Sequence, residues 1–435
     1  MPNRVALDQG FPSISASEAL WGRARGLIPA GTQTLAKGPT QYVDGVAPKY
    51  LARGKGCRVW DVDGNEFIDL SMGIGPVVLG YAHPSVDRAI AEQLESGITF
   101  SLMHPLEVEV AELVRQVVPG ADSVRFSKTG CDVTTAAVRL ARAFTGRDKV
   151  LCCGYHGWHD WYIGSSPRNA GVPAATRALT EVFPYNDLLS VLDALDEQVA
   201  CVILEPTIFQ PPEQDYLRTL KRACEAAGAL LVFDEMWTGF RVALGGAQQR
   251  FDVVADLACF SKAVANGMPL SLLTGRADVM GLLEEDVFFF TTFGGEALSL
   301  AAAKATIGEL RELDVPARLE VAGQELQEGY NRLAVKKGLS HTQATGLPCR
   351  SIVSFDASAG DPLLQKSLVQ QELIRHGVLW TGFHNLCLAH GEAEIDHVLK
   401  AYDRALDTLS SALARGTLLD DLHGKPVQPV FRKTR

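Results

Sequence analysis

The chain lacks several features that mark whole classes of protein. It has nine cysteines, an odd number without any CxxC pair, which is not the pattern of a disulfide framework or a zinc site. We expect buried thiols, with Cys131 as the exception because it lies in a predicted ligand loop. No apolar run approaches the length that spans a bilayer, and the opening MPNRVALDQGFPS has no apolar core of signal-peptide length. These absences predict a cytoplasmic protein without a membrane partner.

A basic surface is also missing. The net charge of −10 is spread along the sequence, which argues against nucleic acid and anionic membranes as partners. Only the tail after Gly424 is locally basic, and we expect a frayed terminus there. What the chain does have is length, because 435 residues with 47% apolar side chains can bury a large core. Two domains are therefore expected.

Short apolar runs alternate with segments of helical period, without internal repeats or low-complexity linkers. Two of the helical segments are TTAAVRLARAF (134–144) and YLRTLKRACEAAG (216–228). This alternation predicts an α/β fold with a mostly parallel sheet covered by helices on both faces. The predicted strands contain residues 124–126, 150–153, 201–204, 230–233 and 257–260.

The same pattern suggests how the domains divide. Residues 84–310 build the predicted sheet and form a large domain. Upstream, residues 50–70 are typical of a β-hairpin with Asp-Gly at its turn. Downstream, a helix over 317–337, a strand over 350–355 and a helix over 393–414 predict a smaller α/β domain. We expect residues 1–83 and 311–415 to share this discontinuous small domain, followed by a tail at 416–435.

Two strand ends carry an acid and a lysine. Asp234 follows the apolar run 229–233, and Lys262 follows the run 257–260. The carboxyl ends of parallel strands are where ligands of open α/β sheets bind. A lysine amine that condenses with an aldehyde, beside a carboxylate that keeps a pyridine nitrogen protonated, is the equipment of a pyridoxal phosphate site. The alternatives are a solvated acid and a surface lysine, but small residues around Lys262 leave room for a bulky ligand.

Other strand ends offer weaker signals. Gly130 and Cys131 begin a helix, where free amides and the helix dipole suit a phosphate, although an ordinary N-capped helix has the same letters. Tyr155 could stack on a flat ring or simply pack. Glu205 directly precedes a proline. It is a candidate cofactor contact because its strand end faces the same edge of the sheet as the other polar strand ends.

A metal site is not expected. His156 and His159 could ligate a metal in principle, but no carboxylate or cysteine partner completes a site at metal-ligand spacing. Nucleotide binding by SMGIGPVVLG (71–80) is a further alternative, and it lacks the Rossmann spacing.

The motifs resemble those of class III pyridoxal-phosphate-dependent aminotransferases, most closely the glutamate-1-semialdehyde 2,1-aminomutase branch. DEMWTGFR (234–241) matches the family's DEVxTGFR apart from Met236, and Ser261-Lys262 follows. The similarity extends from LWGRARGLIPAGTQT (20–34) through AHGEAEIDHVLKAYDRAL (389–406). It implies the PLP-transferase fold of type I and pyridoxal 5′-phosphate as cofactor. Lys262 would hold the cofactor as a Schiff base, and Asp234 would pair with its pyridine nitrogen.

The resemblance also implies the remaining contacts of the cofactor. The amides of Gly130 and Cys131 would hold the phosphate, and Tyr155 would cover the ring. Thr292 matches a threonine that reaches the phosphate from the neighbouring subunit, which implies a homodimer with a shared active site. The full cofactor pocket comprises Thr129, Gly130, Cys131, Tyr155, His156, Glu205, Asp234, Met236, Lys262 and Thr292.

Departures from the family pattern bear on the substrate. Lys37 stands where the aminomutase has a carboxylate-binding arginine, and a lysine cannot form the bidentate fork of a guanidinium. Glu296 and Asp132 add negative charge near the expected mouth of the site. We therefore expect an aminotransferase that moves an amino group from a donor to an aldehyde or keto acceptor, such as a sugar-like hydroxylated compound. The alternatives are the aminomutase reaction and a non-catalytic protein, although Lys262 and Asp234 are both kept. Candidate substrate contacts are Gln33, Lys37, Trp158, Glu296 and His384.

Overall fold

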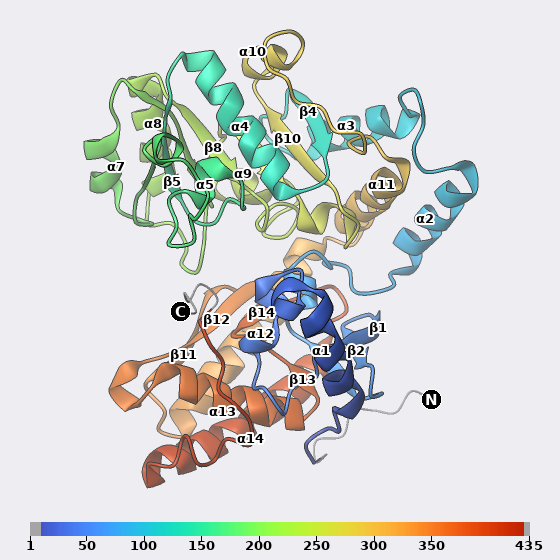
Figure 1. Cartoon of the computed structure of the whole chain (residues 1–435), viewed down its shortest axis with the longest axis vertical. Helices are drawn as coiled ribbons and strands as arrows, with labels where there is room; N and C mark the ends of the chain where they lie inside the picture. Colours follow the sequence, from blue (N-terminus) through green and yellow to red (C-terminus); the bar gives the residue numbers. More distant parts are fainter. Residues whose placement is uncertain (1–9, 430–435) are drawn as a thin grey trace. The chain divides into compact units, whose positions relative to one another are not determined.

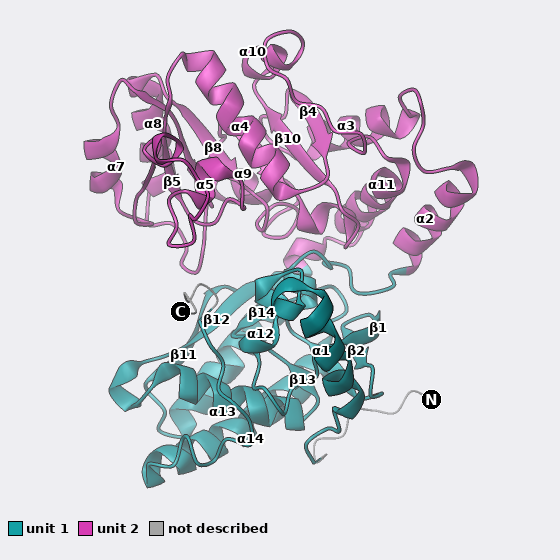
Figure 2. Cartoon of the chain, in the orientation of Figure 1, with its two compact units in different colours: residues 1–83, 318–435 teal, residues 84–317 magenta. Residues whose placement is uncertain are grey.

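The chain forms two compact units, shown in Figure 2. The structure is a computed structural model that describes residues 10–429. Unit 2 is the continuous segment 84–317, whereas unit 1 combines residues 1–83 with residues 318–435. The basic residues Arg432, Lys433 and Arg435 of the predicted frayed tail lie outside the described residues.

Unit 2 is built on a seven-stranded sheet with the order β4-β10-β9-β8-β7-β5-β6 (Figure 1). Strands β9, β8, β7, β5 and β6 pair in parallel, while β10 runs antiparallel between β4 and β9. The strands are β4 (Ser123–Ser127), β5 (Lys149–Cys153), β6 (Thr180–Val182), β7 (Val199–Leu204), β8 (Leu230–Asp234), β9 (Leu257–Phe260) and β10 (Ser271–Gly275). The prediction of a mostly parallel sheet is confirmed, and each of the five predicted runs lies in a strand.

The sheet of unit 2 is buried on both faces. All six residues of the interior strand β7 are buried, and side chains of a strand alternate between the two faces. One face packs against α4, where Val133 and Leu140 share an apolar cluster with Val150 and Ile203. Burying one such side chain stabilises the fold by about 1.5–3 kcal/mol. The helices are α2 (Pro84–Ser96), α3 (Pro105–Val117), α4 (Gly130–Thr145), α5 (Asp160–Ile163), α6 (Ala174–Arg177), α7 (Leu188–Ala194), α8 (Tyr216–Ala227), α9 (Gly246–Phe251), α10 (Ala277–Met280) and α11 (Ala297–Glu312), with 3-10 helices η5 (Lys262–Ala265) and η6 (Gly281–Leu283).

Unit 1 contains a four-stranded sheet, β1-β2-β3-β13, and a three-stranded sheet, β11-β12-β14. The predicted hairpin is confirmed, since β2 and β3 pair antiparallel and Gly64, between them, has a φ of +89°. Strand β13 pairs in parallel with β3, which joins the two separated parts of the unit. The strands are β1 (Leu51–Lys55), β2 (Arg58–Asp61), β3 (Glu66–Asp69), β11 (Thr342–Leu347), β12 (Arg350–Phe355), β13 (Val378–Leu379) and β14 (Phe383–Asn385).

Four α-helices complete unit 1. They are α1 (Ser15–Leu27), α12 (Val315–Lys336), α13 (Pro362–Arg375) and α14 (Glu392–Arg415), with 3-10 helices η1 (Pro29–Gly31), η2 (Leu35–Lys37), η3 (Pro39–Gln41), η4 (Met72–Ile74) and η7 (Ala357–Ala359). After α14 the chain returns to the unit, where the Lys425 amide donates to Asp44 O at 2.8 Å and Val427 is buried. The tail is therefore packed, not frayed, as far as the structure describes it.

Two composition-based expectations can be compared with the fold. The nine cysteines are free thiols, of which eight are buried and Cys131 is half-buried, as expected from the sequence. Within residues 10–429, no helix combines the length and apolarity needed to cross a bilayer.

Candidate active site

The carboxyl ends of neighbouring parallel strands gather polar residues at one edge of the unit 2 sheet. Register pairs Cys153 with Leu204 and Leu204 with Phe233, so the segments after β5, β7 and β8 leave the sheet at the same level. Asp234 pairs with Cys259, three residues before Lys262. The backbone therefore brings the acid and the lysine to one edge of the sheet.

Asp234 is buried and held in a fixed orientation. Its Oδ2 lies 2.7 Å from Nδ1 of His156, and its Oδ1 accepts a hydrogen bond from the Met236 amide at 3.0 Å. A carboxylate only accepts, so Nδ1 of His156 carries the proton of this bond. The imidazole packs against the rings of Trp161 and Tyr162, at 6.0 and 5.2 Å between centroids. His156 therefore fixes the orientation of the acid.

The loop before α4 presents unused amides. Thr129 caps the helix, with its Oγ1 accepting from the Asp132 amide and its own amide donating to Asp132 Oδ2. The amides of Gly130 and Cys131 donate to no other residue in the described part of the chain. First-turn amides have no partner within the helix, and with the helix dipole they form an anion site.

Asp132 is a helix cap and is not aimed at a substrate. Burial opposes its ionisation, but hydrogen bonds from Thr129 and Ser127 outweigh this effect and lower its pKa. Glu296 likewise caps α11 by accepting from the Ser299 amide at 2.8 Å. The expectation that these two acids add negative charge near the mouth of the site stays a prediction, and the structure adds that each carboxylate caps a helix.

Two glycines allow the loop that leads into α4 to pack closely against its neighbours. We call this loop, residues 128–131, the phosphate loop. A Cβ on Gly130 would lie 2.8 Å from Sδ of Met236, and a Cβ on Gly157 would lie 2.5 Å from Sγ of Cys131. Gly157 also has a φ of +108°, which side-chain-bearing residues rarely adopt. Sequence reasoning does not single out Gly157, although a glycine just past a strand end is a usable signal of close backbone approach.

Tyr155 and Glu205 lie together beyond β5 and β7. Glu205 Oε1 accepts from the Tyr155 amide at 2.9 Å, so the acid holds the backbone of the tyrosine. The Tyr155 side chain is half exposed and meets Tyr162 edge-on at 5.6 Å. Burial, followed by the nearby charges of Cys131 and Asp234, raises the pKa of Tyr155. Its ring is therefore near both Cys131 and the acid.

Lys262 has an unusual backbone conformation. It begins η5 with a φ of +46°, in the left-handed region that costs a side-chain-bearing residue on the order of 1–3 kcal/mol. The preceding Ser261 donates through Oγ to Leu270 O at 2.6 Å, which closes the turn around the lysine. Strain held by its surroundings at a strand end is typical of a functional position.

The substrate candidates differ in their exposure. Trp158 is exposed, and Gln33 and Lys37 are exposed within unit 1. His384 is fully buried, with Nδ1 2.7 Å from Ser351 Oγ and Nε2 2.8 Å from Tyr402 OH. Both ring nitrogens are therefore used inside unit 1, and His384 is not available to a substrate in this structure.

The geometry fits the cofactor that the resemblance implies. A buried acid suits a pyridine nitrogen, free amides at a helix start suit a phosphate, and an exposed aromatic ring suits stacking. In the part of the chain that the structure describes, no group of three or more His, Cys, Asp or Glu could hold a metal ion.

Comparisons with known proteins agree with this geometry. The family model for class-III aminotransferases matches residues 43–390. The chain is 35% identical to glutamate-1-semialdehyde 2,1-aminomutase of Roseiflexus castenholzii and 32% identical to 3-aminobutyryl-CoA aminotransferase of Cloacimonas acidaminovorans, each over 92% of this chain and 99% of the relative. The FumI protein of Sphingopyxis sp. MTA144, solved in its PLP internal aldimine form, superimposes with a TM-score of 0.85 at 30% identity, covering 92% of this chain and 97% of FumI. The chain therefore belongs to the class-III aminotransferase family, has the type I fold of pyridoxal-phosphate-dependent transferases, and is a pyridoxal-phosphate-dependent aminotransferase or aminomutase.

Proposed function

We propose that the protein is an aminotransferase that moves an amino group from a donor amine to a small aldehyde or ketone. The observation that carries this proposal is the buried Asp234, held by His156 on the strand beside the one that delivers Lys262. When bound, pyridoxal phosphate supplies an electron sink for the charge left when a proton leaves the donor carbon. Asp234 would accept a hydrogen bond from the protonated pyridine nitrogen, whose positive charge would strengthen that sink.

Lys262 serves two purposes in this proposal. Its amine would hold the cofactor, and when free of it the same amine would take up the proton from the donor carbon. Gly130 and Cys131 bind the phosphate through their amides, and Tyr155 covers the ring. Glu205 and Met236 would act indirectly, because Glu205 holds the Tyr155 amide, while the Met236 amide holds the Asp234 carboxylate and its side chain lies against Gly130.

For the acceptor we propose a hydroxylated, sugar-like carbonyl compound. Support comes from Lys37, an exposed point charge where the aminomutase has a guanidinium, so a substrate carboxylate would be gripped weakly. Trp158 of unit 2 supplies an exposed indole N–H for hydroxyls, and Gln33 is an exposed candidate on unit 1. The second candidate is the aminomutase reaction, favoured by the 35% identity to a glutamate-1-semialdehyde 2,1-aminomutase.

We also propose that unit 2 is the large, cofactor-binding domain and unit 1 the small domain. Unit 2 supplies every residue assigned to the cofactor pocket. Unit 1 supplies the substrate candidates Gln33 and Lys37.

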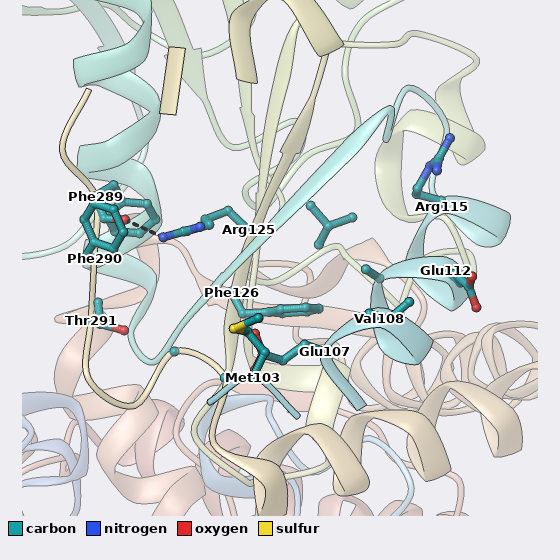
Figure 3. A pocket seen from close by; sticks show the side chains of 14 residues that line it. Met103, Glu107, Val108, Glu112, Arg115, Arg125, Phe126, Phe289, Phe290 and Thr291 are labelled. Atoms are coloured by element: carbon teal, nitrogen blue, oxygen red, sulfur yellow. Dashed lines mark hydrogen bonds between the residues drawn. The ribbon is translucent and has the colours of Figure 1, made fainter. Parts of the chain in front are cut away.

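A homodimer is the third part of the proposal. Large apolar side chains are exposed on two segments of unit 2, including Leu102 and Met103 on the first and Phe288, Phe290 and Phe293 on the second. Such patches mark interaction sites. Between the segments lies a cavity of about 690 Å³ (Figure 3), lined by Met103, residues of α3 and β4, and residues 289–291 and 294–295. A second copy would cover this surface, and the resemblance has the adjacent Thr292 reach the phosphate of that copy.

Half-reactions measured by visible absorption test the proposal. The purified protein should be yellow, and one of a panel of amino donors should bleach it. Carbonyl compounds should then restore the colour, with sugar-like aldehydes and ketones tested against 3-oxo compounds and glutamate 1-semialdehyde. Strict preference for glutamate 1-semialdehyde would favour the aminomutase, and failure of every donor to change the spectrum would contradict both reactions.

A further inference from the structure

Two oppositely charged residues from distant parts of unit 2 meet each other in the structure. Lys128 precedes the cap of α4, and Glu296 is the cap of α11. Nζ of Lys128 lies 3.5 Å from Oε2 of Glu296, and the two side chains are only 17% and 10% exposed. Such a buried pair is sensitive to the loss of either partner, because the remaining charge is left uncompensated.

Each member of the pair is fixed to a different loop. Lys128 directly precedes Thr129, the cap of α4, and its amide lies 3.3 Å from Asp132 Oδ2. Glu296 caps α11 and accepts from the Ser299 amide. The pair therefore joins the start of the phosphate loop to the start of α11, across 168 residues of sequence (296 − 128).

Close polar contacts continue from Glu296 to the segment that carries Lys262 through the Ser299 hydroxyl, whose single proton bonds either Glu296 or the Pro269 carbonyl at one time. The buried hydroxyl of Ser299 lies 2.8 Å from Glu296 Oε1 and 3.1 Å from Pro269 O. The next carbonyl along the chain, that of Leu270, accepts from Ser261 Oγ, one residue before Lys262. A Ser299 hydrogen bond to the Glu296 carboxylate is charge-assisted, which makes it the stronger type.

We propose that Lys128 and Glu296 form a positioning pair, which fixes the phosphate loop at the distance from Lys262 that lets the amine reach the bound cofactor's aldehyde. The pair itself touches neither the substrate nor the reacting atoms. It acts through the Thr129 loop at one end and through Ser299 and Pro269 at the other. The inference rests on the proposed roles of Gly130, Cys131 and Lys262.

Burial lowers the pKa of Lys128, while Glu296 opposes that change. Its ammonium has no hydrogen bond at normal length to any of the described residues, so Glu296 is its main electrostatic partner. Neutralising Glu296 therefore removes the group that keeps Lys128 in place. The amide of Glu296→Gln still offers an oxygen to the Ser299 amide, so the cap of α11 is kept.

The test compares Lys128→Met, Glu296→Gln, the double variant and Lys128→Arg with the full-length protein. Pyridoxal phosphate affinity is measured by fluorescence titration, and covalent trapping by borohydride is measured at saturating cofactor. We expect the affinity to fall about tenfold in each neutral single variant and by a similar, non-additive factor in the double variant. Trapping should also slow in these three variants, and Lys128→Arg should restore both.

Lys304→Met is the matched control. Lys304 also lies on α11, and its ion pair with Glu109 at 2.6 Å is exposed. The Lys304→Met variant should leave cofactor affinity and borohydride trapping unchanged, because exposed ion pairs contribute little to stability. Unchanged affinity and trapping in Lys128→Met and Glu296→Gln, with only a lower melting temperature, would overturn the inference. Failure of the proposed function itself would be seen separately, as wild-type protein without trappable cofactor.

Discussion

Nδ1 of His156 donates to Oδ2 of Asp234 over 2.7 Å, and neither side chain reaches solvent. The second oxygen of the acid is held by the Met236 amide. Hydrogen bonds to charged groups contribute about 1.5–3 kcal/mol, so the imidazole provides a large part of the force that orients the carboxylate.

Replacing His156 by leucine should therefore leave the Asp234 carboxylate less firmly oriented toward the pyridine nitrogen of the cofactor. We expect turnover to fall roughly 10- to 100-fold, the equivalent of that hydrogen bond. The absorption maximum of bound cofactor should also titrate at a different pH, measured by spectrophotometry. His159→Gln is the control, since His159 bonds Thr135 instead of the acid. Equal spectra and rates in the two variants would contradict the orienting role.

Lys262→Ala should abolish turnover and leave no cofactor attached to the protein after borohydride reduction. The reason is that the amine is both the covalent anchor and the base. Peptide mass spectrometry of the reduced wild type should find the modification at residue 262. Lys400→Ala, on the exposed face of α14, should behave as wild type. Full activity of Lys262→Ala would end the proposed mechanism.

Gly157→Ala should loosen the cofactor, because its new Cβ would lie 2.5 Å from Sγ of Cys131 in the phosphate loop. We expect at least a tenfold rise in the dissociation constant for pyridoxal phosphate, measured by fluorescence. Gly171→Ala is a matched control with a φ of +90° and no atom within 4 Å. It reproduces the backbone strain without the clash, so equal losses in both variants would show that strain alone is responsible.

The buried His384 should make unit 1 sensitive to acid. Burial, with a smaller contribution from His390, lowers its pKa from 6.5 to about 3. The unfolded chain takes up a proton as the pH falls below 6.5 while the folded chain does not, so stability present above 6.5 is lost between pH 6.5 and 3. The slope should approach about 1.4 kcal/mol for each pH unit.

Urea unfolding of His384→Gln should show a shallower dependence on pH in this window, although the variant is less stable at pH 7. His423→Gln, at an exposed position, should keep the wild-type slope. If His384→Gln and the wild type lose stability in parallel, the buried imidazole is not the group responsible.

Charged substitutions in the apolar patch should break the proposed homodimer. Leu102 and Met103 are 79% and 82% exposed, so changing both to aspartate should not disturb the fold of unit 2. Sedimentation should then detect monomers, with weaker cofactor binding because Thr292 of a second copy is lost. Leu189→Asp, at an exposed position on α7, should leave the assembly intact. An unchanged sedimentation coefficient in the double variant would exclude this surface.

The strands were predictable where burial on both faces leaves an uninterrupted apolar run, as in β7 and β8. The search for long apolar runs misses β10, because SLLTG is short and ends in glycine. Its antiparallel direction is set by its pairing with neighbouring strands, which the sequence does not show. Helix α11 has many small residues and little difference between its faces, so periodicity does not reveal it. The hairpin was predictable because its Asp-Gly turn is a local signal.

The residues of the candidate site also divide into those that the sequence predicts and those that it does not. Asp234 and Lys262 are visible in sequence because each directly follows a strand, and a strand end sets its place. The ring nitrogens of the buried His384 are hydrogen-bonded by Ser351 and Tyr402, and the charge of Glu296 is balanced by Lys128. These partners are distant in sequence and belong to other elements, so only the folded chain shows that they meet.

The parallel pairing of β3 with β13 has a consequence for how the protein is made. Ile68 emerges from the ribosome early, but its strand neighbour Val378 is synthesised only after the whole of unit 2. Until then β3 exposes an unpaired edge, which invites association with other chains. Unit 2 can mature as a continuous segment during translation, whereas unit 1 must wait for the C-terminal third. We therefore expect truncated or stalled chains to aggregate through the N-terminal hairpin and not through the cofactor-binding sheet.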